Sequence, residues 1–252
     1  MAKSPSYQPR LYREAMGNKR WTSFRSAYLE TDLWVAIDSG HYRKEAQRFT
    51  MDRILCYREI LENHIRAHPE FRESLTPVAA PGGVHPLIEE MSEAALAAGT
   101  GPMSAVAGAL AEFICMDLLA EYEADEVVVE NGGDIFMKLT APVAVAVHAG
   151  SSPLSEKIAL QIKPGETPLA LCCSSGTVGH SLSFGMADAC MIACRSGAEA
   201  DAMATAVCNQ VKNEEMVYEV TEEALGQPQV ISVVIIAGKK LGIGGQIEIK
   251  IV

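Results

Sequence analysis

An acidic and a hydroxyl side chain, Asp201 and Thr205, stand four residues apart in an alanine-rich stretch with a helical pattern. Residues four apart on a helix project from the same face, and the side chains around these two are small. A carboxylate and a hydroxyl presented together can share a hard cation such as Mg²⁺, with diphosphate oxygens and water completing the octahedron. The alternative is an ordinary surface Asp and a Thr that bonds back to its own helix.

Three glycine-containing turns follow expected strands or precede an expected helix, where backbone N–H groups can bind an anion. The first covers residues 99–101. The other two provide the cofactor-binding candidates, which are Asn131, Gly132, Gly133 and Asp134, and Ser174, Ser175, Gly176 and Thr177. Each turn taken alone is equally typical of an ordinary tight turn.

His180 follows the third turn and is the candidate catalytic residue. A histidine there can contact phosphate or act as a general acid or base near neutral pH. The alternative is a histidine that bonds carbonyl groups of its loop. His85 and His148 are weaker candidates, and an Asp that follows a Gly-Gly turn, as Asp134 does, is also a common turn cap.

Seven cysteines occur without the spacing of a disulfide framework, which indicates a reducing compartment. Cys172 and Cys173 abut the third turn and are candidates for a reactive thiol. Adjacent residues of a strand point to opposite faces, so at most one of them can face a pocket there. The alternative is that they are small buried hydrophobic residues.

The hydrophobic pattern predicts helices and strands in a definite order. Helices are expected at 41–68, 86–98, 103–122 and 197–212, and a strand or hairpin at 21–37. Further strands are expected at 127–129, 135–139, 143–148, 157–162, 169–173, 187–194, 230–237 and 245–251, the last two joined as a hairpin by residues 238–242. Long helices in the first half and clustered strands in the second favour an α+β fold with a mostly antiparallel sheet.

Composition indicates one globular domain at residues 21–252 after a polar N-terminal arm at 1–20, since no linker separates two cores. Apolar residues make up 48% and charged residues 21%, and the net charge is −11. That charge argues against nucleic acid and anionic membranes as partners.

The absence of an apolar run at the N-terminus, and the glycines and serines that interrupt residues 167–187, predict a cytoplasmic protein without a membrane span. Homodimer formation is left open.

The order of these motifs resembles the C-terminal half of ApbE-type FAD:protein FMN transferases. The Asn-Gly-Gly-Asp turn, the Ser-Ser-Gly turn after a strand, and residues 187–188 opening a strand that leads to 198–206 follow one another as in that family. Residues 103–119 are similar to the helix that precedes its Asn-Gly-Gly-Asp turn. Within the superfamily the chain is more similar to the UPF0280 branch, over about residues 12–252, through residues 12–13, 30–33, 101–103 and 180–185.

The resemblance implies an ApbE-like (T-fold-like) domain with Asp201 and Thr205 as magnesium ligands and the Gly-Gly-Asp turn beside a flavin nucleotide. The expected cofactors are therefore Mg²⁺ and FAD or FMN, and the expected partner is a small molecule with phosphate groups. Archaeal UPF0280 proteins also suggest a role in sulfur assimilation.

Three departures from the transferase pattern keep the activity open. Residues 105–108 lack the lysine that the transferases carry, residues 180–185 replace an Asp-Pro and Thr-Gly segment, and the N-terminal flavin-gripping region is not recognisable. The sequence thus leaves three hypotheses: a Mg²⁺-dependent transferase-like enzyme with His180 near the reacting bond, a non-catalytic binding or accessory protein, and a sulfur-handling role for Cys172 or Cys173.

Overall fold

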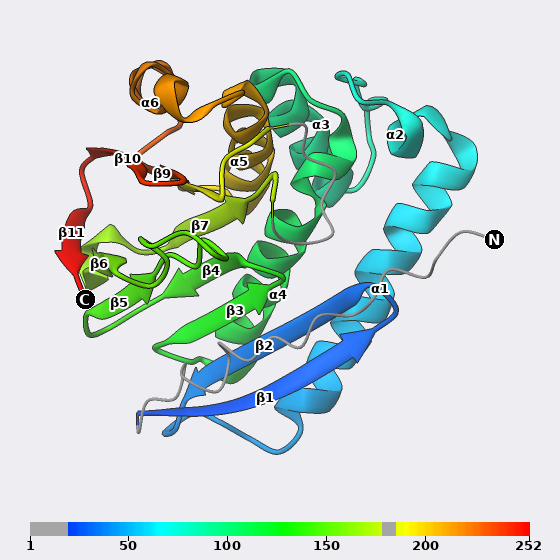
Figure 1. Ribbon diagram of the computed structural model, residues 1–252. Coiled ribbons are helices and arrows are strands. Elements are labelled where there is room, and N and C mark those ends of the chain that lie inside the picture. Colours follow the sequence, from blue (N-terminus) through cyan, green and yellow to red (C-terminus); the bar gives the residue numbers. More distant parts are fainter. Residues whose placement is uncertain (1–19, 178–184) are drawn as a thin grey trace.

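The structure is a computed structural model that describes residues 20–177 and 185–252. Eight strands form one sheet (Figure 1), in which every pair of neighbours is antiparallel. Their order across the sheet is β1 (Trp21–Tyr28), β2 (Thr31–Asp38), β3 (Val127–Asn131), β4 (Asp134–Lys138), β7 (Leu169–Ser174), β8 (Ala189–Cys194), β9 (Ser232–Ala237) and β10 (Lys240–Gly245). The predicted α+β fold with a mostly antiparallel sheet is confirmed.

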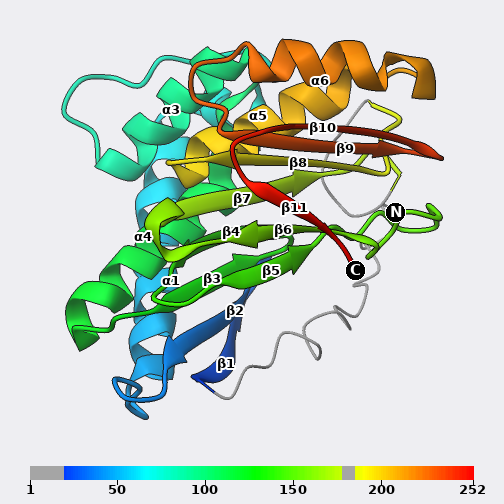
Figure 2. The ribbon, with the colours of Figure 1, turned by 90° about the vertical axis from the view of Figure 1, so that its left-hand side faces the viewer.

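A second, three-stranded sheet covers one face of the large one. It contains β11 (Glu248–Ile251), β6 (Ile158–Ile162) and β5 (Val143–Ala146), in that order and also antiparallel. Figure 2 shows these strands in front of the large sheet, with α1, α3 and α4 behind it.

Helices cover the opposite face. They are α1 (Ala46–Ala67), α2 (Glu70–Glu73), α3 (Pro86–Ala98), α4 (Val106–Tyr122), α5 (Gly197–Gln210) and α6 (Val217–Leu225), and short 3₁₀ turns occur at Pro102–Ala105, Pro164–Glu166 and Glu214–Met216. The four long helices predicted from the sequence are all present. The pattern at 103–122 divides into a 3₁₀ turn and α4, since the chain bends at Pro102 before the α-helix begins.

The strand period of two separates two hydrophobic cores. In β3, Val127 and Val129 face the helices, whereas Val128 faces the small sheet. The same alternation continues in β7, where Ala170 and Cys172 lie on the helical side. Because both faces are covered, the central strands are continuously apolar, and residues from distant parts of the chain meet on the helical side.

The prediction for the last hairpin was wrong in one respect. Strand β9 turns at Gly238, which has a φ of +56°, directly into β10, and β11 pairs with β6 in the small sheet. Residues 238–242 were expected to form the turn, whereas residues 240–245, which include Gly242, Gly244 and Gly245, form β10. Those glycines instead allow α6 to pack closely, since a Cβ at Gly242 or Gly244 would collide with α6 side chains. Helix α6 itself was not predicted.

One segment of the described chain, Pro102–Tyr122, is long and apolar enough to cross a membrane by length and composition. In the fold this segment packs against the sheet, and Ala109, Ile114 and Leu118 are fully buried in the core. These residues of the segment thus belong to the core of the protein.

Candidate functional site

The Asn-Gly-Gly-Asp turn joins β3 to β4, with Asn131 opposite Asp134 in the register. Gly132 and Gly133 have φ values of +72° and +110°, a left-handed region that side chains disfavour. These glycines let the chain reverse in two residues, so both polar side chains of the turn are held on the helical side of the sheet. Both are buried, with 6% of Asn131 and 8% of Asp134 exposed.

Helix α5 packs on β7, β4 and α4 (Figure 1). Its Asp201 thereby reaches the first turn of α4. Asp201 Oδ2 accepts the backbone N–H groups of Ala107 and Gly108 at 3.0 and 2.9 Å. Asn131 Nδ2 donates to the Ala107 carbonyl at 3.1 Å. The first turn of α4 therefore joins the β3–β4 turn to α5.

The buried carboxyl group of Asp134 and the half-buried one of Asp201 interact through their charges. Asp134 Oδ1 accepts the N–H of Cys173 at 3.2 Å. Burial, and after it the charge of Asp201, raises the pKa of Asp134 well above its usual range. Burial also raises the pKa of Asp201 to about 7, although its two N–H donors act in the opposite direction. Two like charges so placed would be stabilised by a cation between them.

Thr205 lies one helical turn beyond Asp201, as the spacing predicts. Its side chain is half-buried and makes no hydrogen bond to any part of the chain that the structure describes. By contrast, the hydroxyls of Thr50 and Thr221 bond back to their own helices at 2.8 and 2.6 Å. Thr205 is thus not the back-bonded threonine that was the alternative explanation, and its hydroxyl is available to a ligand.

Within residues 20–177 and 185–252, no three His, Cys, Asp or Glu side chains form a group that could hold a metal ion. A cation at Asp201 and Thr205 would therefore need oxygens from a ligand and from water. This fits Mg²⁺, which usually keeps several waters and is bound through one or two carboxylates plus substrate phosphates. The donor set available here is consistent with that arrangement.

The Ser-Ser-Gly turn extends the site along β7. Ser174 is two residues from Cys172 and therefore shares its helical side. Its Oγ is buried, and it has no hydrogen-bond partner among the described residues. A buried hydroxyl without a partner is unfavourable unless a ligand or water binds it. Ser174 is the member of this turn that the structure best equips to contact a ligand.

The amide groups of both turns are less available than the sequence suggested. Gly133 N–H donates to Glu130 Oε1 at 2.8 Å, Gly176 N–H to the Ala187 carbonyl at 2.9 Å, and Thr177 N–H to Ser175 Oγ at 3.1 Å. These three amides are already paired within the protein. Phosphate binding by the turns stays a prediction, and it would depend on their side chains more than on these amides.

The other polar candidates have structural partners or cannot be placed. Asp188 accepts from Thr177 Oγ1 at 2.8 Å and from Gly238 N at 2.7 Å, so it connects two turns. His85 caps α3 through the Leu87 N–H at 3.1 Å. His180 lies outside the described residues, and its catalytic role stays a prediction.

Cys172 faces the site and Cys173 does not. Cys172 Sγ lies 3.7 Å from the Gly197 carbonyl, which it approaches as a donor. Burial, followed by the charges of Asp134 and Asp201, raises the pKa of Cys172 well above its usual value. A protonated buried thiol is a poor nucleophile, so the geometry favours the alternative that these cysteines are packing residues.

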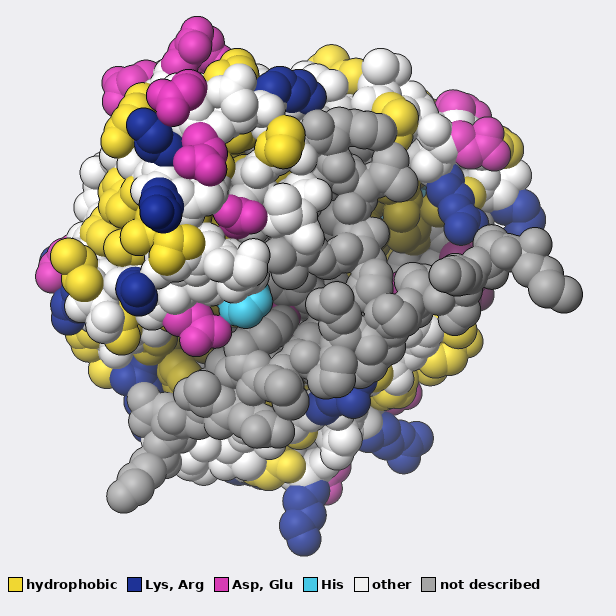
Figure 3. Space-filling model, viewed as in Figure 1, with side chains coloured by type: hydrophobic (Ala, Val, Ile, Leu, Met, Phe, Trp, Pro, Cys, Tyr) yellow, Lys and Arg dark blue, Asp and Glu magenta, His cyan; other side chains and the backbone are white. Residues whose placement is uncertain are grey.

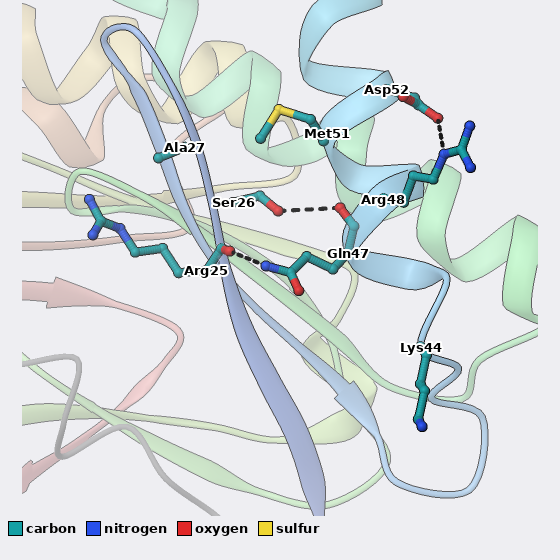
Figure 4. A pocket seen from close by; sticks show the side chains of 8 residues that line it. All are labelled: Arg25, Ser26, Ala27, Lys44, Gln47, Arg48, Met51 and Asp52. Carbon is teal, nitrogen blue, oxygen red and sulfur yellow. Dashed lines mark hydrogen bonds and ion pairs between the residues drawn. The ribbon is translucent and has the colours of Figure 1, made fainter.

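Two surface hollows lie away from these residues. The larger, of about 580 Å³, lies between β1 and α1 (Figure 4), and the other, of about 260 Å³, lies between α5 and α6. Figure 4 shows that the side chains of Arg25, Lys44 and Arg48 point in different directions, and Gln47 donates to the Arg25 carbonyl at 3.0 Å. The cationic groups do not converge, so the hollow is not a formed anion site. On the face in Figure 3, basic side chains are dispersed among acidic ones.

Comparisons with known proteins agree on one family and one fold. A family profile described as AbpE bacteria matches residues 13–231. A UPF0280 protein of Methanocaldococcus jannaschii is 34% identical over 90% of this chain and 92% of its own length. Another, from Methanoregula boonei, is 40% identical over 73% of this chain and 76% of its own.

Solved structures of ApbE proteins share the fold at low sequence identity. A variant of the flavin transferase ApbE from Vibrio cholerae superposes with a TM-score of 0.57 at 11% identity, covering 89% of this chain and 96% of that one. The apo flavinyl transferase ApbE of Pseudomonas stutzeri gives a TM-score of 0.55, also at 11% identity, over 89% of this chain and 93% of its own. At this level of identity the likeness shows the fold alone.

Proposed function

The chain belongs to the UPF0280 family and has the ApbE fold, and from this premise we propose that it binds a flavin or another nucleotide diphosphate together with Mg²⁺. The site that we propose lies between the first turns of α4 and α5 and the turn that joins β3 to β4. The Asp134–Asp201 pair is the observation that carries the proposal.

Two carboxylates buried close together are unfavourable when both are charged. In the described chain they share no Lys or Arg partner in any hydrogen bond or ion pair. A divalent cation supplies the missing positive charge and favours the deprotonated state of both groups. This is a reason for a folded protein to retain such a pair.

Four side chains provide the contacts in this proposal. Asp201 uses Oδ2 for α4 and presents Oδ1 to the cation, and the Thr205 hydroxyl is the second ligand. Asp134 lies close enough to act through its charge, and Ser174 donates its buried hydroxyl to an oxygen of the ligand. When bound, Mg²⁺ would neutralise the diphosphate and polarise its P–O bonds.

Transfer chemistry is the finer part of the proposal. In a transferase-like reaction His180 would exchange a proton with the reacting group as a general acid or base. Helix α4 (Val106–Tyr122) contains no Lys or Arg that could assist. This observation favours the second candidate function, a protein that binds the nucleotide without turnover.

The binding proposal is tested by titrating FAD into the protein and following flavin fluorescence, with Mg²⁺ or with a chelator. We expect binding only with Mg²⁺, and at least a tenfold loss of affinity in Asp201→Asn, which keeps an acceptor for α4. Asp117→Asn is the matched control, because Asp117 bonds Arg53 and Tyr57 on the far side of α4. Equal affinity with and without chelator would refute the role of the metal.

The two candidate functions differ in whether FAD is cleaved. Incubation of the Mg²⁺-loaded protein with FAD and an acceptor peptide should release AMP if the chain is a transferase. FAD that binds and is recovered intact supports the binding protein.

A further inference from the structure

Helices α4 and α5 contact each other through two glycines near their first turns. A Cβ added at Gly108 would collide with the Gly197 carbonyl, and one added at Gly197 would collide with the Gly108 carbonyl. The two backbones are therefore in direct contact, and no side chain lies between them to fix their relative position. The position of α5 on α4 is therefore set by contacts beside this crossing, which include the packing of α5 on β7, β8 and α3.

Two carboxylates, one from each helix, add polar contacts between the helix starts. Asp201 of α5 accepts the N–H groups of Ala107 and Gly108 in the first turn of α4. In return, Glu112 of α4 accepts the N–H of Gly197 at 2.6 Å, in the first turn of α5. The first turns of helices have N–H groups without intrahelical partners. Each helix thus caps the other.

Glu112 is well placed to be the more critical of the two caps. Ser196 also bonds its carboxylate, which therefore holds the residue before α5 as well as the first residue of the helix. Its surroundings are acidic, since Glu90 of α3 and Glu199 of α5 lie nearby. Among the described residues, the backbone group that Glu112 binds is the N–H of Gly197, at the start of α5.

We propose that Glu112 is a positioning residue for the cation site, which it serves by fixing the start of α5 so that Asp201 and Thr205 face Asp134. This inference rests on the proposed function, and it adds to that function a residue that touches neither cation nor nucleotide. If Glu112 acts by positioning α5, the length of its side chain matters for the cation site and its charge does not. A glutamine preserves the acceptor at the same distance, whereas an aspartate preserves the charge but is one methylene shorter.

The test compares Mg²⁺-dependent FAD affinity in Glu112→Gln, Glu112→Asp and Glu112→Ala, with Asp117→Asn as a control on the same helix. We expect Glu112→Gln and the control to remain within threefold of the unchanged protein. Glu112→Asp and Glu112→Ala should lose tenfold or more, with faster hydrogen exchange at residues 197–201. If Glu112→Ala does not fold, the Gln and Asp variants still decide the question.

The possible results distinguish the positioning role of Glu112 from the proposed Mg²⁺-dependent binding of FAD. Affinity that is kept in Glu112→Asp and lost in Glu112→Gln would show a dependence on charge and would overturn the positioning role. Unchanged affinity in all three variants would overturn it as well, while Mg²⁺-dependent binding of FAD would still stand. Absence of Mg²⁺-dependent binding in the unchanged protein would refute the proposed function, and the inference with it.

Discussion

Removing the charge of Asp201 should change how stability depends on pH. Because the pKa of Asp201 is raised to about 7 in the folded protein from an ordinary 3.8, the folded state retains a proton that the unfolded chain has lost. The free energy of unfolding should therefore fall as pH rises from about 4 to about 7. The difference between these two pKa values corresponds to a loss of at most about 4 kcal/mol in the free energy of unfolding.

The assay is urea unfolding of the metal-free protein at pH 5 and pH 8, compared with Asp201→Asn. The unchanged protein should be less stable at pH 8, and the variant should lose the part of this difference that Asp201 contributes while keeping an acceptor for Ala107 and Gly108. The buried Asp134 and Glu90, whose pKa values are also raised, keep their own part of the pH dependence. Mg²⁺ with FAD should restore stability at pH 8, by about 2.7 kcal/mol at a hundredfold excess over the Kd. An equal pH dependence in both proteins would refute the assignment of a buried, proton-binding carboxylate to this position.

Three further predictions concern neighbouring groups. Burial, and then the charge of Glu112, raises the pKa of Glu90 to about 7, so Glu90→Gln should raise the melting temperature at pH 8 and have little effect at pH 5. A Cβ at residue 197 collides with α4, so Gly197→Ala should cost about 1–3 kcal/mol in urea unfolding and weaken FAD binding; full stability would contradict the close helix contact. Cys172 is buried with a raised pKa, so maleimide should label Cys56 first and Cys172 only on unfolding; rapid labelling of Cys172 in the folded protein would restore the sulfur hypothesis.

The parts of the site that lie within one element could be predicted from the sequence. The spacing of Asp201 and Thr205 places them on one face wherever the helix forms, and the two glycines after β3 require a turn that directs Asp134 back along β4. These are consequences of helix periodicity and of backbone sterics. They hold without knowledge of the tertiary structure.

The parts that depend on distant contacts could not be predicted. That Asp134 faces Asp201 follows from the pairing of β4 with β7 and from the packing of α5 above them, neither of which is visible in a local pattern. The contact between Glu112 and Gly197 was missed for the same reason, since the two residues are 85 positions apart. The available signal was Gly108 inside the apolar helix α4, because a glycine inside a helix is unfavourable unless two backbones meet.

The central claim is that a cation is held by α5 beside the β3–β4 turn, with the diphosphate of the nucleotide as its other ligand. Crystals grown with FAD and Mn²⁺, a substitute for Mg²⁺ with an anomalous signal, test this most directly. We expect an anomalous peak beside Asp201 and Thr205, at about 2.0–2.2 Å from their oxygens, with phosphate oxygens on its other side. Bound FAD with no peak at this place, or with the metal elsewhere, would contradict it.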